Sequence, residues 1–289
     1  MESKFELAQG SGLFLIHKPQ RFVYSDASAT GCGSVFTLHE EHIYHRPWEP
    51  SECSKSSTWR ELAAIDFSLE SFAPVLEGSL VKWFTDSQSA AKLVEVGSMK
   101  LDLHRLAVKI FQLCAEHNIR LEVQLIPRTE NEKADYISRL IDFDDWQITP
   151  EFFLRLEELW GPHTVDCFAN FYTARLPRFF SRFWNPETSG VDFFVQNLES
   201  ENCLVVPPVS LIARALHYLS LQKARATIVI PVWPSSSFRS LLTSQYKPFM
   251  KDCYQQNGSE ALTLGRKLNS FLGSVNFTGN VVAVRLEFL

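Results

Sequence analysis

Hydrophobic and polar positions alternate with a period of two where the chain first shows a regular pattern. Residues 21–26 (RFVYSD) are rich in β-favouring side chains, and a glycine turn at residues 30–33 leads into a second such segment at residues 34–38. Residues 42–45 follow a charged turn and have the same character. We therefore predict three consecutive strands that form an antiparallel meander.

After this meander, strand and helix patterns follow one another up to residue 140. Apolar residues with helical spacing begin after Thr58 and predict a helix that ends before Pro74. The remaining predicted elements of this half are, in order, a strand at 80–85, a helix that begins at Ser87, a longer helix around 103–113, a strand at 120–125 and a helix at 130–140. The order is three strands, a helix, a strand, two helices, a strand and a helix.

The second half resumes the alternation after residues 142–150, which we interpret as a charged connector. The pattern predicts strands at 164–168, 203–206, 226–232 and 281–286, a helix at 211–222 and a mixed tail at 262–279. Strands that alternate with helices are typical of a parallel α/β sheet. The sequence thus predicts two α/β domains, residues 1–145 and residues 146–289.

Composition argues against a disordered or membrane-spanning chain. The 289 residues are 45% hydrophobic and 13% aromatic, enough for sizeable cores. No apolar run approaches the roughly 18 residues that span a bilayer, and Met1 is not followed by an apolar leader. The six cysteines lie far apart, which argues against a zinc clip or a disulfide framework. We expect an intracellular protein with reduced thiols and no membrane partner.

Charge is distributed unevenly between the two halves. Residues 1–145 carry 15 Lys and Arg against 22 Asp and Glu, whereas residues 146–289 carry 13 against 11. An acidic surface repels phosphate, but acids that gather in one cleft bind divalent cations, which reverse the local field. The placement of individual acids in the first half therefore matters more than the net charge.

Four acids of the first half stand where predicted elements begin or end. Asp26 ends the first strand and Asp86 follows the fourth, while Glu61 and Asp135 lie on the first and last predicted helices. Carboxylates at neighbouring strand ends, with two helices packed beside them, can project into one pocket. Such a pocket offers only hard oxygen ligands, which suit Mg²⁺ or Mn²⁺ better than zinc.

Each acid also has a purely structural interpretation. Residues 58–61 (TWRE) fit a capping box, in which the glutamate bonds its own helix terminus. Asp86 could cap the following helix, and Asp26 could be a turn residue. Asp135 could pair with Arg139 one helical turn later. Singly these interpretations are the simpler ones, but together they require four independent coincidences.

Motifs around the four acids occur in a fixed order: residues 24–33 (YSDASATGCG), 57–62 (STWREL), 84–87 (FTDS) and 131–139 (NEKADYISR). Together they resemble the ribonuclease H domain of retroelement polyproteins, especially DIRS-like tyrosine-recombinase retrotransposons. The resemblance covers residues 20–141 and implies a ribonuclease H-like mixed sheet with flanking helices.

The activity that this resemblance implies is hydrolysis of RNA in RNA–DNA hybrids by two Mg²⁺ or Mn²⁺ ions roughly 4 Å apart. Asp26 would bridge both ions, and Asp135 would complete the ion on the side of the attacking water. Glu61 and Asp86 would hold the ion on the side of the leaving 3′-oxygen, with Glu61 near a 2′-hydroxyl in the minor groove. The substrate-contacting positions that the motifs imply are Ser28, Arg128 and Asn131.

One loop departs from the family pattern. Many members carry a histidine before the last helix, where this chain has residues 126–130 (IPRTE). The family histidine is thought to help product release, and Arg128 cannot shuttle protons because a guanidinium stays charged. We therefore expect turnover to be slowed more than the cleavage step itself. The departure keeps a second hypothesis open, a catalytically inactive nucleic-acid-binding or accessory module of a reverse transcriptase. A transposase or integrase of the same fold fits less well, because those enzymes normally end their acid set with glutamate and lack a counterpart of Glu61.

In the second half, residues 164–170 (TVDCFAN), 205–208 (VVPP) and 227–233 (TIVIPVW) resemble the segment that follows ribonuclease H in the same retroelements. They are also similar to phage-type adenine-N6 methyltransferases, in which a polar residue precedes the paired prolines and an aromatic follows. Here Val206 and Val209 take those places and can neither bond nor stack a base. We therefore predict a Rossmann-like domain without methyltransferase activity.

Arginines and aromatic residues are interleaved in this half: Arg175, Arg178, Arg182 and Arg214 with Phe179, Phe180, Phe183 and Trp184. Such a string can grip a phosphate backbone and stack unpaired bases. A half-buried aromatic face beneath solvated arginines gives the same string. The expected partners are an RNA–DNA hybrid and a reverse transcriptase or recombinase of the same element.

Overall fold

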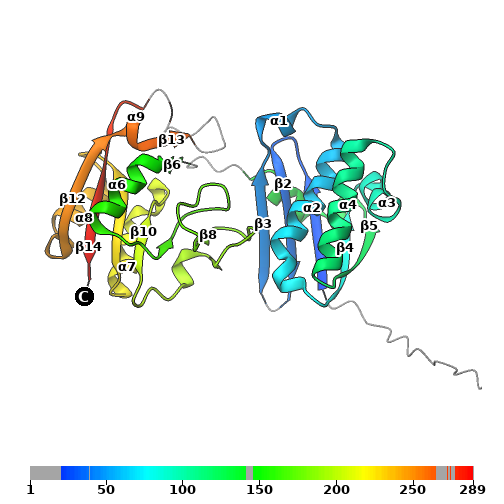
Figure 1. Ribbon diagram of the computed structural model, residues 1–289, viewed down its shortest axis with the longest axis horizontal. Coiled ribbons are helices and arrows are strands. Elements are labelled where there is room, and N and C mark those ends of the chain that lie inside the picture. The colour runs from blue at the N-terminus through cyan, green and yellow to red at the C-terminus, as the bar shows by residue number, and fades with distance from the viewer. Residues whose placement is uncertain are drawn as a thin grey trace, which may run out of the picture.

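The fold is given by a computed structural model, which describes residues 21–38, 40–140, 146–264, 272, 274 and 277–288. Figure 1 shows two α/β halves next to each other, each built on its own five-stranded sheet. The predicted α/β class, with mixed sheets and flanking helices, is confirmed. None of the described helices is both long and apolar enough to cross a bilayer.

The N-terminal half follows the predicted order of elements, except that a short helix absent from the prediction comes after the third strand. Its strands and helices are β1 (Arg21–Ala27), β2 (Gly31–Thr37), β3 (Glu41–Pro47), α1 (Pro50–Cys53), α2 (Ser57–Leu76), β4 (Leu80–Thr85), α3 (Gln88–Val96), α4 (Leu101–Glu116), β5 (Arg120–Leu125) and α5 (Glu132–Ser138). The sheet has the order β3-β2-β1-β4-β5, with an antiparallel meander β1–β3 and with β1, β4 and β5 parallel. Because β1 and β4 are parallel neighbours, their carboxyl ends lie at the same edge of the sheet.

The long helix α2 differs from its prediction at both ends. Its N-cap is Ser56, whose side-chain oxygen accepts the backbone N–H of Trp59 at 3.2 Å. It also continues past Pro74 to Leu76, so the predicted end before the proline is wrong. A proline in the last turn removes only one backbone hydrogen bond, and the fully buried Leu76 anchors that turn in the core.

A buried carboxylate ties α2 to α4. Lys109 of α4 donates to Asp66 Oδ2 at 3.2 Å and to Glu70 Oε2 at 2.8 Å. Asp66 is fully buried, and its Oδ1 has no hydrogen-bond partner among the described residues. Burial raises the pKa of Asp66 to about 6, because Lys109 offsets only part of the lost hydration.

This carboxylate makes a testable contribution to the pH dependence of stability. The unfolded chain releases the Asp66 proton near its ordinary pKa of 3.8 and the folded protein near 6, so the free energy of unfolding falls as the pH rises between these values. Relative to Asp66→Asn, the unmodified protein should lose about 2 to 3 kcal/mol between pH 4 and pH 7 in urea denaturation. Parallel pH profiles of the two proteins would contradict this.

The C-terminal half is built on a second mixed sheet. Its elements are β6 (Trp146–Ile148), α6 (Pro150–Trp160), β7 (Val165–Asp166), β8 (Phe180–Ser181), β9 (Gly190–Val191), β10 (Asn202–Val205), α7 (Ile212–Leu221), β11 (Arg225–Pro231), α8 (Ser237–Thr243), β12 (Met250–Asn257), α9 (Gly258–Ala261), β13 (Leu262–Leu264) and β14 (Asn280–Glu287). The sheet order is β12-β14-β11-β10-β7. β7, β10 and β11 are parallel, with α7 connecting β10 to β11 as a βαβ unit, and β14 is antiparallel to both of its neighbours.

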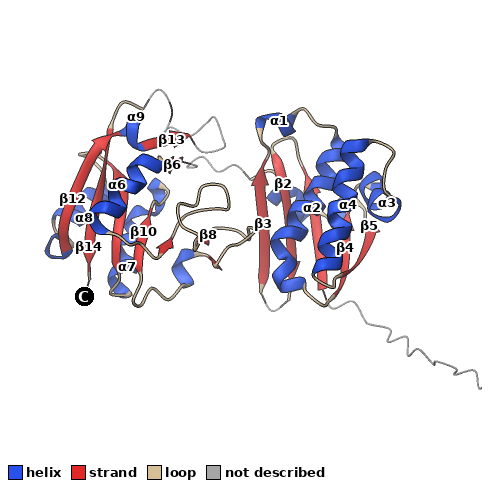
Figure 2. Cartoon of the chain, in the orientation of Figure 1, coloured by secondary structure: helices blue, strands red, loops and turns tan. Residues whose placement is uncertain are grey.

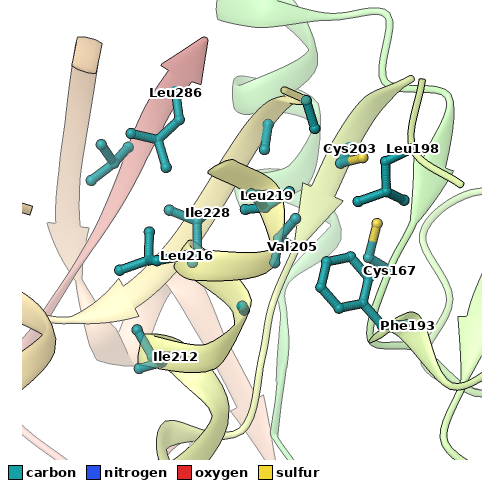
Figure 3. Packing of buried hydrophobic residues seen from close by; sticks show 14 of the residues in the cluster. Cys167, Phe193, Leu198, Cys203, Val205, Ile212, Leu216, Leu219, Ile228 and Leu286 are labelled. Carbon is teal, nitrogen blue, oxygen red and sulfur yellow. The ribbon is translucent and has the colours of Figure 1, made fainter. Parts of the chain in front are cut away.

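One of the two hydrophobic clusters that the described residues of this half form lies where α7 covers the sheet. Figure 3 shows Ile212, Leu216 and Leu219 of α7 facing Val205 of β10 and Ile228 of β11. All five side chains are fully buried. The three helical positions are spaced by four and three residues, which places them on one helix face.

Several elements of the C-terminal half were not predicted from the sequence. The predicted connector at residues 142–150 contains β6 and the start of α6, while residues 142–145 lie outside the described residues. β12 has mostly exposed side chains without an apolar alternation, so no pattern marks it as a strand. The predicted strand at 164–168 is reduced to β7, and much of the predicted tail at 262–279 lies outside the described residues.

The two halves meet at the edge strand β3. The backbone N–H of Trp184 donates to the Ile43 carbonyl at 2.8 Å, and the Trp184 ring packs edge-on against Phe72 and His42. Figure 2 shows mostly loop around β8, and Trp184 lies in the loop that follows this strand. A loop of the C-terminal half thus covers the edge of the N-terminal sheet, which would otherwise present unpaired backbone groups.

Trp184→Ala should loosen this junction. Loss of the ring removes its packing on both neighbours, and we expect the free energy of unfolding to fall by about 2 to 4 kcal/mol in urea denaturation. Phe111→Ala is the matched control, because Phe111 is an aromatic residue that is 73% exposed and should change stability by less than about 0.5 kcal/mol. Equal effects of the two substitutions would show that Trp184 does not hold the halves together.

Candidate functional site

Two carboxylates meet where β1 and β4 end. Asp26 lies within β1, in register with Gly33 of β2, so its interpretation as a turn residue is wrong. Asp86 directly follows β4, and its interpretation as a helix cap is also wrong, because Ser87 caps α3 by accepting the N–H of Ala90. The parallel pairing of β1 with β4 therefore brings both acids to one sheet edge.

Glu61 reaches the same edge from α2. Because Ser56 is the N-cap of this helix, Glu61 lies beyond the capping positions and the capping-box interpretation is wrong. Its carboxylate instead accepts the backbone N–H of Ala27 at the end of β1. One oxygen each of Asp26, Glu61 and Asp86 lies within 4.8 Å of the other two. Three of the four predicted acids thus converge.

Burial and mutual repulsion shift the protonation of this group. Burial, together with the charges of Asp26 and Asp86, raises the pKa of Glu61 to about 9. Burial also raises the pKa of Asp26, although Ser138 donates a hydrogen bond to its Oδ2 at 2.7 Å. The buried Glu61 Oε2 has no hydrogen-bond partner in the described part of the chain.

The group fits a divalent cation. It consists of carboxylates without a thiol or an imidazole, which suits Mg²⁺ or Mn²⁺. A cation among Asp26, Glu61 and Asp86 would remove their repulsion and give the unpaired oxygen of Glu61 a partner.

Asp135, the fourth predicted acid, lies outside this group of three. Its Oδ1 accepts hydrogen bonds from Arg128 at 2.8 Å and from Arg139 at 2.6 Å. Partial burial opposes the change, but these hydrogen bonds lower the pKa of Asp135. Its charge still contributes to the raised pKa of Asp26, so the two acids are electrostatic neighbours. The predicted pair with Arg139 is therefore present, and Arg128 adds a second.

Close approach of α5 to β2 brings Asp135 and Ser138 to the strand end. A Cβ atom at Gly33 would lie 2.4 Å from the backbone nitrogen of Ser138 and 2.6 Å from Ile137 Cγ2, so this contact requires glycine. Ser138 was not among the predicted site residues, although it is fully buried and donates a hydrogen bond to Asp26. Its spacing of three residues from Asp135, on one helix face, is the signal that could have revealed it.

The three predicted substrate-contacting residues each have a partner within the protein. Ser28 Oγ donates to the Ser138 carbonyl at 2.7 Å, and Asn131 Nδ2 donates to the Ser25 carbonyl at 2.9 Å. Asn131 is buried, whereas Arg128 is exposed in its pair with the fourth acid. These contacts position the loops around the acids, and contact with a substrate stays a prediction for all three.

Neither a protein-family model nor a curated protein matches the sequence. Among solved structures, the chain is similar to ribonuclease H domains. LC11-RNase H1, isolated from compost, is 20% identical, with 42% of this chain and 93% of that chain covered and a TM-score of 0.35. RNase H1 from Halobacterium salinarum is 18% identical, with 40% and 91% covered and a TM-score of 0.32. Foamy viral protease-reverse transcriptase in complex with RNA/DNA hybrid is 14% identical, with 40% and 19% covered and a TM-score of 0.31.

Mg²⁺ should stabilise the protein through the three converging acids. At a concentration 100 times its Kd, the ion should add about 2.7 kcal/mol to the free energy of unfolding, because it binds only the folded state. Asp26→Asn should remove most of this gain, whereas Asp66→Asn, which changes a buried acid outside the group, should keep it. Scanning calorimetry with Mg²⁺ and with a chelator measures the effect. An equal rise in Tm for all three proteins would show that the ion binds elsewhere.

Proposed function

We propose that this chain is a ribonuclease H-type endonuclease that hydrolyses RNA in RNA–DNA hybrids with two Mg²⁺ or Mn²⁺ ions. The observation that carries the proposal is the convergence of Asp26, Glu61 and Asp86 at the carboxyl ends of two parallel strands. Acids that repel one another in a buried place cost stability unless protons or a cation neutralise them, and this cost supports a functional reason for their convergence.

The residues of the chain contribute in different ways. When bound, divalent ions activate water and neutralise charge at the scissile phosphate. Asp26 and Asp86 offer oxygens from strand ends and Glu61 from a helix, while Ser138 orients Asp26. Arg128, exposed beside the acids, supplies the positive charge that an approaching phosphate backbone requires.

We further infer that the chain derives from a DIRS-like retroelement and consists of two domains, residues 1–145 and 146–289. The order of the four motifs supports the origin, and the two separate sheets support the division. The second domain would be methyltransferase-like but without methyl transfer, since Val206 and Val209 replace the base-contacting residues. A reverse transcriptase or recombinase of the same element is the protein partner that this origin implies.

The ion pairs of Asp135 favour a second candidate function. If Arg128 and Arg139 stay paired with the Asp135 carboxylate, this carboxylate cannot ligate a metal ion. The second ion then lacks a site. The protein would then bind hybrids without cutting them, as an accessory module of a reverse transcriptase.

Cleavage of a labelled RNA–DNA hybrid in Mg²⁺ distinguishes these functions. The unmodified protein should cut the RNA strand, and Asp86→Asn should lower the rate at least about 100-fold, because a charge contact at the reacting group is worth two to three orders of magnitude. Asp102→Asn changes an exposed acid in the first turn of α4 and should keep the full rate.

Equal product from the unmodified protein and Asp86→Asn would reject the nuclease. Hybrid binding that persists in a chelator, without any cleavage by the unmodified protein in Mg²⁺, would favour the accessory module.

A further inference from the structure

Two arginines bind the carboxylate of Asp135, the acid that lies outside the group of three. Arg128 Nη2 donates to Asp135 Oδ1 at 2.8 Å, and Arg139 Nη2 donates to the same oxygen at 2.6 Å. A cation at this carboxylate would lie next to two guanidinium groups, which repel it because they stay charged. The arginines therefore decide whether the fourth predicted acid is available as a metal ligand.

The backbone of Asp135 is fixed beside the other acids. Ser138 Oγ lies 2.7 Å from Asp26 Oδ2 and 2.8 Å from the carbonyl oxygen of Asp135, so this hydroxyl holds the turn of α5 against Asp26. The helix also packs on Gly33, where a Cβ atom would lie 2.4 Å from the backbone nitrogen of Ser138. Rotation of the Asp135 side chain, without movement of α5, therefore changes where its carboxylate points.

Both ion pairs lie at the surface and are easily exchanged. The side chains of Arg128 and Arg139 are 68% and 53% exposed, and that of Asp135 is 23% exposed. Exposed ion pairs hold weakly, because water screens the charges and two long side chains lose freedom. Each arginine donates one N–H to Asp135, whereas a phosphate group accepts two parallel N–H groups from one guanidinium. A phosphate is therefore a strong competitor for these arginines.

The proposed reaction brings phosphates to this place. The charge of Arg128 interacts with those of Asp26 and Asp86 as well as with that of Asp135, so the guanidinium stands beside the whole acid group. A hybrid whose scissile phosphate lies at the acids carries further phosphates on both sides of it in the same strand. These phosphates approach the exposed guanidinium groups when the hybrid binds.

Two arginines of the interleaved string in the second half have other contacts. Arg175 donates to the Ile148 carbonyl at 3.0 Å, and Arg178 is paired with Glu201. Both contacts join parts of the second half to each other. An exchange of partners at Asp135, in contrast, changes the set of acids that a cation can use.

We propose that Arg128 and Arg139 bind phosphates of the hybrid and thereby release Asp135 to the acid group. Without the hybrid, the two arginines hold the Asp135 carboxylate. With it, they exchange this carboxylate for phosphate oxygens, so binding of the hybrid and of a cation support each other. The inference rests on the proposed function, because it takes the acids as the metal site and a hybrid as the substrate.

Hybrid binding in a chelator tests the phosphate contacts without cleavage. Fluorescence anisotropy of a labelled RNA–DNA hybrid measures the Kd of the full chain at several salt concentrations. Arg128→Gln and Arg139→Gln should each weaken binding about threefold to tenfold and lower the steepness of its salt dependence by about one phosphate contact. Arg155→Gln is the matched control, because Arg155 is 48% exposed and pairs with Glu158 one helical turn away, and it should change neither quantity.

Competition between Asp135 and phosphate is tested in the same assay. Asp135→Asn should tighten hybrid binding in the chelator, because it removes the competitor for the two arginines. Part of this gain comes from loss of a negative charge, so the substitution is repeated in the double variant Arg128→Gln/Arg139→Gln, where no competition is left. The gain should be at least about threefold larger in the unmodified background than in the double variant.

Calorimetric titration with Mg²⁺, without the hybrid, tests whether the arginines withhold Asp135. Asp135→Asn should weaken Mg²⁺ binding at least about tenfold in the double variant, where the carboxylate is available. In the unmodified background, where the arginines hold it, the same substitution should weaken binding less than about threefold. Comparing the two backgrounds separates release of the ligand from the general effect of removing positive charge.

The inference is overturned if the hybrid does not bind in the chelator, if Arg139→Gln weakens binding no more than Arg155→Gln, or if Asp135→Asn acts equally in both backgrounds. None of these measurements uses cleavage. A protein that gives the expected binding but does not cut would reject the nuclease and keep the exchange, and cleavage without the expected binding would do the reverse.

Discussion

Burial of acids beside one another, with the repulsion that it strengthens, is the main electrostatic constraint on the first half of the chain. Asp26 and Glu61 meet Asp86 in a space where burial disfavours the charges of the first two. The fold compensates locally: Ser138 donates to Asp26, and the N–H of Ala27 reaches Glu61. These two hydrogen bonds do not neutralise three acids, so a cation bound among them would be expected to stabilise the arrangement.

The sequence predicts the members of this group better than it predicts their bonding. Asp26 and Asp86 could be predicted because each stands at or next to the end of a strand, and parallel neighbours bring their carboxyl ends together. The ion pairs of Asp135 could be predicted only in part. Arg139 lies one helical turn away, within the reach of a pattern. Arg128 precedes α5 in a separate 3-10 turn, so its contact depends on how that turn folds back.

The fold, like the site, could be predicted from the sequence only where the signal is local. β4 and β5 match their predicted bounds because each is a compact apolar or alternating segment with strand-ending residues beside it. β12 has an exposed surface, and its place in the sheet comes from pairing with β14, more than twenty residues later in the chain. The docking of Trp184 on β3 is likewise invisible locally, since its partners lie more than a hundred residues earlier. What sequence periodicity cannot encode is contact between segments far apart in the chain.

A row of paired strand residues runs from Asp26, one of the three converging acids, to a cavity between the two halves. Asp26 of β1 pairs with Gly33 of β2, and Gly33 pairs with His45 of β3, which lines the cavity. Neighbouring strands lie about 4.8 Å apart, so this row crosses about 10 Å of sheet. Its middle member must remain glycine because α5, the helix that carries Asp135, packs directly on it. The loop that carries Trp184 bonds β3 at Ile43, two residues before His45, so the second half contacts the same strand that ends this row.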